Sequence, residues 1–202
     1  MSVVWSDDSK ISRISSDGRR PILCRKGVTF GNRRVNGQVK FGGGGKMVRG
    51  CMCGNEFGWL LNINDTMESK VYVVILKKYL KPSVEDWFGK WPAKNKWTFM
   101  QDNDPKHKSR PTMSWLQEQG VQVIPWPANS PDLNPIEFAW GIIKQRVRDM
   151  VAAKNTEQLW DRIVQAMQSI WDDDVSLLVL VRSMPKRFAA VIKAKGGHFT
   201  TY

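Results

Sequence analysis

The fold is decided by residues 126–137, which read Trp126-Pro127-Ala128-Asn129-Ser130-Pro131-Asp132-Leu133-Asn134-Pro135-Ile136-Glu137. The prolines exclude a regular helix from most of this stretch, and Asn134 followed by Pro135 is typical of a helix start. Beyond that point apolar residues recur at the spacing of one buried helical stripe: Ile136, Ala139, Trp140, Ile143, Val147 and Val151. We therefore predict a proline-rich loop that leads directly into an amphipathic helix, with Glu137 in its first turn.

Glu137 can have either of two roles at that position. Asn134, Pro135 and Glu137 nearly form a capping box, in which the glutamate would bond back to the Asn134 backbone. Alternatively, a carboxylate in the first turn is kept ionised by the helix dipole and can bind a metal ion. The spacing alone favours capping, and the two roles can coexist.

Two aspartates earlier in the chain follow runs that are typical of strands. Asp7 follows Val3-Val4-Trp5, and Asp102 follows Trp97-Thr98-Phe99-Met100. We expect Asp7, Asp102 and Glu137 to lie within a few ångströms of one shared metal position. Three converging carboxylates suit a hard divalent cation such as Mg²⁺, and two such ions can drive phosphoryl transfer.

Neighbouring residues compete with these aspartates or support them. Asp8 should point to the opposite side of its strand from Asp7, because side chains alternate along a strand. Asp104 would share a side with Asp102, but its place before a proline is typical of a turn. Asn103, Asp104 and His107 are predicted to support the site, although His107 can also be a phosphate contact or an ordinary turn residue.

The remaining pattern predicts strands and helices in a mixed order. The expected strands cover residues 2–6, 11–15, 46–52, 58–63, 96–101 and 121–124. The expected helices cover residues 69–80, 111–119, the segment from 135, 156–171 and 185–195. Early strands followed by alternating helices and strands indicate an α/β fold, a mixed sheet flanked by helices in the ribonuclease-H-like order, in a single domain over residues 1–202.

The net charge of +12 is unevenly distributed along the 202 residues. Residues 17–46 carry eight Lys or Arg side chains against one Asp. The net charge of this segment is therefore more than half of the net charge of the chain. Such a segment favours contact with DNA phosphates, although it can also be a solvated loop. The predicted DNA contacts are Arg19, Arg20, Arg25, Lys26, Arg33, Arg34 and Lys40. No apolar run approaches the length of a membrane span, so we expect no contact with a membrane.

Three blocks of the sequence resemble the catalytic domain of Tc/mariner-type DDE transposases: Trp5-Ser6-Asp7-Asp8-Ser9-Lys10, residues 101–107 and residues 130–137. The 34 residues between Asp102 and Glu137 also match that family, and the likeness runs from about residue 3 to the C-terminus. It implies that Asp7, Asp102 and Glu137 are the catalytic metal ligands. Two residues depart from the family pattern. Asp8 stands where relatives often have Glu and Arg49 where they commonly have Trp, so we expect different local packing.

The resemblance implies metal-dependent cleavage at transposon ends and transfer of the freed 3′-OH into target DNA at TA dinucleotides. It implies two Mg²⁺ or Mn²⁺ ions, a homodimer on double-stranded DNA, and a nuclear location. Residues 16–46 would form a clamp-like insertion that reaches a partner subunit. The helix-turn-helix region that precedes this domain in complete relatives is predicted to be absent. Two other functions stay open, namely an inactive or domesticated copy that binds DNA or protein, and a ribonuclease-H-like nuclease that does not join strands.

Overall fold

The chain is seen in a computed structural model that describes residues 2–13, 44–63, 68–172 and 177–195. At its centre lies a mixed sheet with the order β3-β2-β1-β5, and β4 pairs with β2 beside that path. The strands are β1 (Ser2–Ser12), β2 (Gly45–Cys53), β3 (Glu56–Phe57), β4 (Leu61–Ile63) and β5 (Trp97–Met100). β1 is antiparallel to β2 and parallel to β5, which makes the sheet mixed as predicted.

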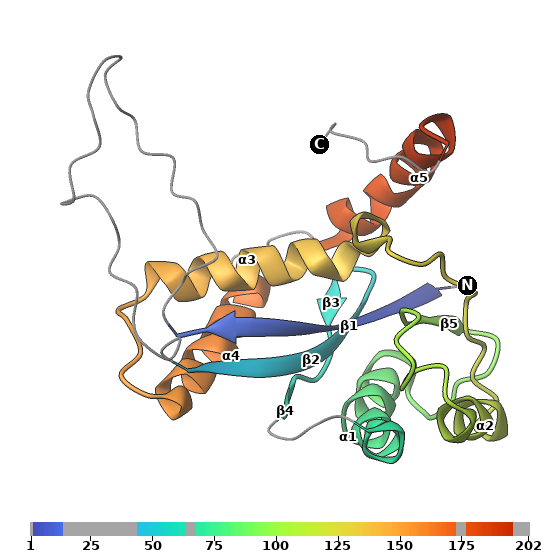
Figure 1. Cartoon of the computed structure of the whole chain (residues 1–202), viewed down its shortest axis with the longest axis horizontal. Coiled ribbons are helices and arrows are strands. Elements are labelled where there is room, and N and C mark those ends of the chain that lie inside the picture. The colour runs from blue at the N-terminus through green and yellow to red at the C-terminus, as the bar shows by residue number, and fades with distance from the viewer. Residues whose placement is uncertain (1, 14–43, 64–67, 173–176, 196–202) are drawn as a thin grey trace.

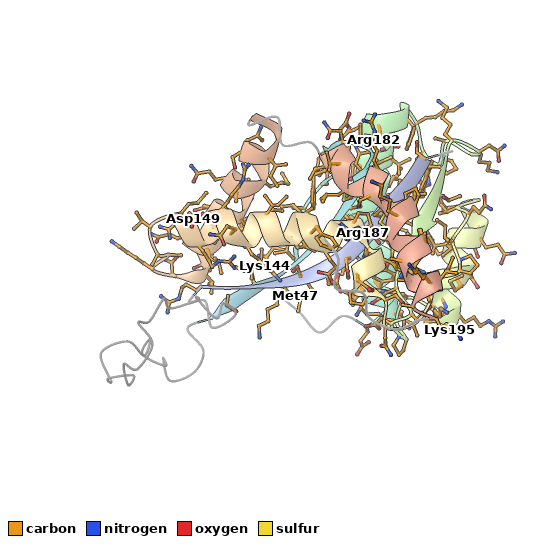
Figure 2. All side chains as sticks on the ribbon, turned by 90° about the horizontal axis from the view of Figure 1, so that it is seen from above. Met47, Lys144, Asp149, Arg182, Arg187 and Lys195 are labelled. Carbon is orange, nitrogen blue, oxygen red and sulfur yellow. The ribbon has the colours of Figure 1, made fainter. Side chains whose placement is uncertain are left out.

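Helices cover both faces of this sheet (Figure 1). They are α1 (Ser69–Phe88), α2 (Arg110–Glu118), α3 (Pro135–Asp149), α4 (Thr156–Asp172) and α5 (Leu177–Lys193), with a 3₁₀ turn η3 (Pro131–Leu133) before α3. α1 and α2 pack on one face around a buried cluster of their own. α3, α4 and α5 pack on the other face around a second cluster, and Figure 2 shows their side chains from above. Within the described residues, no helix is long and apolar enough to cross a membrane.

Strand β1 contributes side chains to both clusters, because its side chains alternate between the two faces of the sheet. Val4 is buried among the residues of α1, whereas Trp5 and Ile11 are buried among those of α3 and α4. Alternation therefore places Asp7 on the α3 side and Asp8 on the α1 side. The two neighbouring carboxylates face opposite layers of the molecule, as the sequence predicted.

The first strand is longer than expected. We predicted separate strands at residues 2–6 and 11–15, but one strand runs through Asp7 and Asp8 to Ser12. Its ladder with β2 is unbroken from Val4, opposite Cys53, to Ser12, opposite Gly45. Aspartates are poor strand formers in isolation, so the sequence indicated a break. Here cross-strand pairing and polar partners on both faces hold them in the ladder.

Helix α1 also continues past its predicted end at residues 81–82. Pro82 removes one backbone hydrogen bond, yet the helix runs on to Phe88. The next residues explain this. Ser83 is buried and its Oγ donates to the carbonyl of Tyr79 at 2.6 Å, while Val84 is buried in the α1 cluster. Packing of this last turn outweighs the local cost of the proline.

Elsewhere the predicted elements are shifted or shortened. Of the strand predicted at 58–63, only β4 (Leu61–Ile63) forms, and β3 lies just before the predicted range. Residues 121–124 form only a bridge between Val123 and Phe99. α5 begins at Leu177, before the predicted start at Pro185. α3 begins at Pro135 as predicted. However, Val151 lies beyond its end and is 84% exposed, so it is not part of the buried stripe.

Candidate active site

Asp7 lies in the middle of β1 on the side of α3. Its Oδ2 accepts a hydrogen bond from Nδ2 of Asn134 at 3.1 Å, and its Oδ1 accepts one from the backbone N–H of Asp8 at 2.7 Å. Burial, followed by the nearby negative charge of Glu137, raises the pKa of Asp7 to about 7. Asp7 is thus a carboxylate whose ionised form is disfavoured by its surroundings.

Asp102 lies two residues beyond the end of β5, and its side chain is 49% exposed. Its Oδ1 is hydrogen-bonded to Nδ1 of His107 and accepts the backbone N–H of Asp104 at 3.1 Å. Burial alone would raise the pKa of Asp102, but the hydrogen bonds and the His107 contact outweigh burial and lower it to about 2. Asp102 is therefore ionised across the physiological range, in contrast to Asp7.

Glu137 lies in the first turn of α3, and the capping interpretation of it is wrong. The backbone N–H of Asn134 donates to the carbonyl of Pro131 at 2.9 Å, not to the Glu137 carboxylate. The Asn134 side chain makes no capping hydrogen bond either. Its amide instead bonds Asp7 and approaches the carbonyl of Ser6 at 3.5 Å. The residue that looked like a cap joins the start of α3 to β1.

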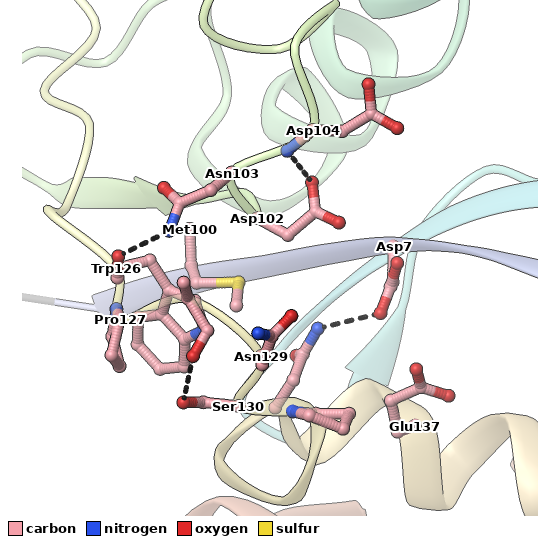
Figure 3. A pocket seen from close by; sticks show the side chains of 13 residues that line it. Asp7, Met100, Asp102, Asn103, Asp104, Trp126, Pro127, Asn129, Ser130 and Glu137 are labelled. Atoms are coloured by element: carbon pink, nitrogen blue, oxygen red, sulfur yellow. Dashed lines mark hydrogen bonds between the residues drawn. The ribbon is translucent and has the colours of Figure 1, made fainter.

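The three carboxylates face one cavity of about 430 Å³ (Figure 3). Its wall is formed by the end of β5, the proline-rich loop and the start of α3. The lining residues are Asp7, Met100, Asp102, Asn103, Asp104, Trp126, Pro127, Ala128, Asn129, Ser130, Pro131, Asn134 and Glu137. Asp7 and Glu137 lie on one side of this cavity, and Asp102 lies across from them.

The carboxylates share the cavity without converging as closely as we expected. Among the described residues, no three His, Cys, Asp or Glu side chains lie close enough together to hold one metal ion. The physical reason lies in their partners. Asp102 is held by His107 and Asp7 by Asn134, and like charges repel, so these two carboxylates are drawn toward their own neighbouring donors.

The residues predicted to support the site have distinct contacts. Asn103 donates from Nδ2 to the carbonyl of Trp126 at 2.8 Å, which joins the end of β5 to the proline-rich loop. Asp104 accepts from Nζ of Lys106 at 2.6 Å and from the Lys106 backbone. Asp104 lines the cavity, but its oxygens are already engaged. This favours Asp102 over Asp104 as the metal ligand.

His107 is 2% exposed and links Asp102 to the interior. Its ring lies 4.2 Å from the ring of Tyr72, and its Nε2 is 3.2 Å from Arg49. Burial lowers the pKa of His107, and the positive charge of Arg49 adds to this, although Asp102 opposes it. A buried neutral imidazole that orients a carboxylate fits the supporting role predicted for it.

Sequence reasoning missed the role of Arg49, which is fully buried on the α1 side of β2. Its hydrogen-bonding partners are the side chains of Asp8, Tyr72, Tyr79, Ser6 and His107. The salt bridge to Asp8 measures 2.7 Å. A signal was present, since an arginine interrupts an otherwise apolar strand segment and departs from the family's usual Trp. That signal did not identify the partners.

The donor atoms around the cavity suit a hard divalent cation. All three carboxylates offer oxygen, and the side-chain oxygens of Asn103 and Asn134 are buried without a hydrogen-bond partner in the described part of the chain. Oxygen-only surroundings are what Mg²⁺ and Mn²⁺ prefer. The raised pKa of Asp7 points the same way, because a bound cation would offset the repulsion between Asp7 and Glu137.

The predicted DNA contacts lie outside the described residues. Arg19, Arg20, Arg25, Lys26, Arg33, Arg34 and Lys40 all fall within residues 14–43. The clamp-like insertion predicted for residues 16–46 falls almost wholly in the same segment.

Comparison with known proteins gives the class of the fold and the site. The family described as "DDE superfamily endonuclease" matches residues 2–160. The chain is 38% identical over 197 residues to the Tcb1 transposase of Caenorhabditis briggsae, covering 96% of this chain and 68% of that relative. It is 35% identical over 197 residues to the Tc1 transposase of Caenorhabditis elegans, with the same coverage.

Solved structures share the fold at low sequence identity. The Mos1 mariner paired-end complex with Mn superposes with a TM-score of 0.74 at 16% identity, covering 98% of this chain and 56% of that chain. The Mos1 catalytic domain with raltegravir and Mg gives 0.66 at 15% identity, covering 98% of this chain and 85% of that chain. The predicted ribonuclease-H-like α/β fold is thereby confirmed.

The chain is therefore a DDE superfamily endonuclease. Within that class it belongs to the Tc1-type transposases and corresponds to their catalytic domain. The resemblance seen in the sequence is confirmed, and it extends over nearly the whole chain.

Proposed function

We propose that this chain cuts DNA at transposon ends and joins the freed 3′-OH to target DNA, with Asp7, Asp102 and Glu137 as its metal ligands. One observation carries the proposal: β1, the end of β5 and the start of α3 bring these three carboxylates to one cavity. The chain spans 68% of the Tcb1 transposase and 56% of the Mos1 chain, so the activity of the whole transposase is proposed here.

The metal would be Mg²⁺ or Mn²⁺, in two ions, held by the three carboxylates. When bound, such ions activate the attacking oxygen and stabilise the leaving one. The protein's own contribution is positioning. His107 and the Asp104 backbone hold Asp102, and Asn134 holds Asp7, so these two side chains are kept at the cavity before DNA arrives.

The partner would be double-stranded DNA bound by a homodimer, with TA dinucleotides as targets and the nucleus as the location. A two-ended reaction supports the dimer, since each end needs its own set of carboxylates. The structural neighbours include a Mos1 paired-end complex and a Mos1 strand transfer complex. The net charge of +12 supports a polyanionic partner.

A strand-transfer assay tests the proposal and separates it from its rivals. A labelled duplex with a free 3′-OH transposon end is incubated with a plasmid that contains TA sites, with Mg²⁺ or Mn²⁺. We expect labelled plasmid joined at TA, and none with Asp102→Asn. Nicks without joining would indicate a nuclease, and DNA binding without either product would indicate an inactive binding module.

The DNA contacts are tested by the salt dependence of binding. Replacing Arg19, Arg20, Arg33 and Arg34 with Ala should weaken binding to all sequences. The log–log salt slope should fall by about 0.9 for each DNA phosphate that the variant no longer neutralises. An unchanged slope together with unchanged strand transfer would show that this segment is a solvated loop.

A further inference from the structure

Arg49 lies on the opposite face of the sheet from the cavity, yet it is connected to one of the three carboxylates. Its Nη1 contacts both Asp8, at 2.7 Å, and Nε2 of His107, at 3.2 Å. The other ring nitrogen of His107 contacts Oδ1 of Asp102. A chain of polar contacts therefore runs from the buried α1 side through His107 to the cavity.

The direction of each hydrogen bond along this chain follows from chemistry. A guanidinium has only N–H donors and no acceptor, and it stays protonated in proteins. Nε2 of His107 must therefore accept from Arg49 through its lone pair. A neutral imidazole that accepts at Nε2 carries its proton on Nδ1. That Nδ1–H then donates to Asp102.

We propose that Arg49 is a positioning residue for Asp102, which acts by fixing the direction of the His107 hydrogen bond. Both described hydrogen bonds to Asp102, from His107 and from the Asp104 backbone, fall on Oδ1. In Figure 3 the second carboxylate oxygen points toward Asp7. Arg49 thus determines which oxygen of Asp102 is offered to the cavity.

Without Arg49 the imidazole loses this constraint. Its proton can then move to Nε2, which leaves a bare Nδ1 lone pair facing the Asp102 carboxylate. Two acceptors repel, so Asp102 would turn away from its position. The ring itself would stay in place, because it packs against the Tyr72 ring at an angle of 35° and the His107 carbonyl accepts from Gln101 at 3.1 Å.

A purely structural role for Arg49 is the alternative, and Tyr79 provides the control. Tyr79 accepts from Nε of Arg49 at 3.1 Å and is buried in the same cluster, but the structure gives it no hydrogen bond to His107 among the described residues. Tyr79→Phe removes one hydrogen bond of Arg49 and leaves the contact with His107. A structural role predicts that both variants disturb the site, and a positioning role predicts that only Arg49→Met does.

The decisive experiment is ¹⁵N NMR of the imidazole nitrogens in the metal-free chain at pH 8. The chain has only two histidines, so His198→Gln assigns the His107 signals. We expect His107 to carry its proton on Nδ1 in the wild type and in Tyr79→Phe, and an Nε2–H population to appear in Arg49→Met. An Nε2 proton in the wild type would overturn the proposal. That spectrum needs no change at Arg49, so an Nε2 proton would overturn the proposal even if Arg49→Met does not fold.

A second measurement tests whether the His107 tautomer affects metal binding, and it rests on the proposed function. The half-saturating Mn²⁺ concentration for strand transfer should rise roughly 10- to 100-fold in Arg49→Met, the usual effect of losing an outer partner of a metal ligand. It should be unchanged in Tyr79→Phe and intermediate in Arg49→Lys. Equal shifts in Arg49→Met and Tyr79→Phe would overturn the positioning role. An inactive wild type would instead contradict the proposed function and leave the nitrogen spectrum standing.

Discussion

Asp7 and Asp8 are adjacent in the sequence and face opposite sides of the same strand. Cationic side chains bond to the carboxylate of Asp8, whereas neutral donors bond to that of Asp7. Asp8 is bonded to Arg49 at 2.7 Å and lies 3.8 Å from Nζ of Lys106. The described hydrogen bonds of Asp7 come from neutral donors, the Asn134 amide and a backbone N–H. One face compensates its carboxylate with cations of the protein itself. The other gathers carboxylates around a cavity, which is the electrostatic arrangement of a cation site.

The largest expected effect concerns activity on the Asp7 side. Asp7→Asn, Asp102→Asn and Glu137→Gln should each lower strand transfer at least about 100-fold, because each removes a proposed ligand of the cations that would stabilise transition-state charge. Asp104→Asn is the matched control and should be much milder, because Lys106 already engages that carboxylate. Gel quantification of joined product measures the effect. A greater loss in Asp104→Asn than in Asp102→Asn would reverse the assignment.

The second prediction concerns stability on the Asp8 side. Arg49→Met should lower the free energy of unfolding by about 3 kcal/mol, because it leaves the Asp8 carboxylate without its buried partner. In urea titrations the double variant Asp8→Asn/Arg49→Met should be more stable than Arg49→Met alone. Equal stability of the two variants would mean that the Asp8 carboxylate does not need Arg49 as its charged partner.

The third prediction is a pH dependence that only the Asp7 side shows. The pKa of Asp7 rises from 3.8 to about 7 on folding. Between those values the unfolded chain has released a proton that the folded chain keeps, so stability falls as pH rises from about 4 to 7. Asp7→Asn should remove this fall and stabilise the metal-free chain at pH 7, by on the order of 2 kcal/mol after allowance for solvent screening.

Thermal unfolding of both forms at several pH values measures this difference. Asp102→Asn is the matched comparison, because the pKa of Asp102 is lowered to about 2 and its substitution should not stabilise the chain at pH 7. Parallel stability curves for the wild type and Asp7→Asn would contradict the prediction.

The smallest effects come from one hydrogen bond on each face. Asn134→Ala and Tyr79→Phe should each cost about 1 kcal/mol of unfolding free energy. Their effects on strand transfer should differ, because Asn134 bonds to Asp7 in the cavity whereas Tyr79 bonds to Arg49 on the other face of the sheet. Similar activities in the two variants would show that the contact with Asp7 has no part in positioning it.

Much of this could be predicted from local sequence. The apolar stripe of α3, the opposite orientations of Asp7 and Asp8, and a mixed sheet flanked by helices all follow from periodicity and alternation. Each of these signals lies within a short segment, so it can be read from a single sequence. The different roles of Asp102 and Asp104 could also be predicted, because an aspartate before a proline is typical of a turn.

The rest depended on contacts between distant segments. Asn134 had the sequence pattern of a helix cap, but its amide is used by Asp7, 127 positions earlier in the chain. Arg49 reaches His107, which is 58 positions away. Pro82 indicated the end of a helix, but the helix continues to Phe88 because its last turn packs in the core. Propensity and spacing contain no information on such pairings, which only the folded chain brings together.

The central claim, that the Asp7 face binds catalytic cations, is tested most directly by diffraction. Crystals of this chain with a short 3′-OH duplex would be soaked with Mn²⁺ and measured for anomalous scattering. We expect Mn²⁺ in the cavity with oxygens of Asp7, Asp102 and Glu137 at about 2.0–2.6 Å. Mn²⁺ bound elsewhere, in crystals that still carry out strand transfer, would contradict the assignment.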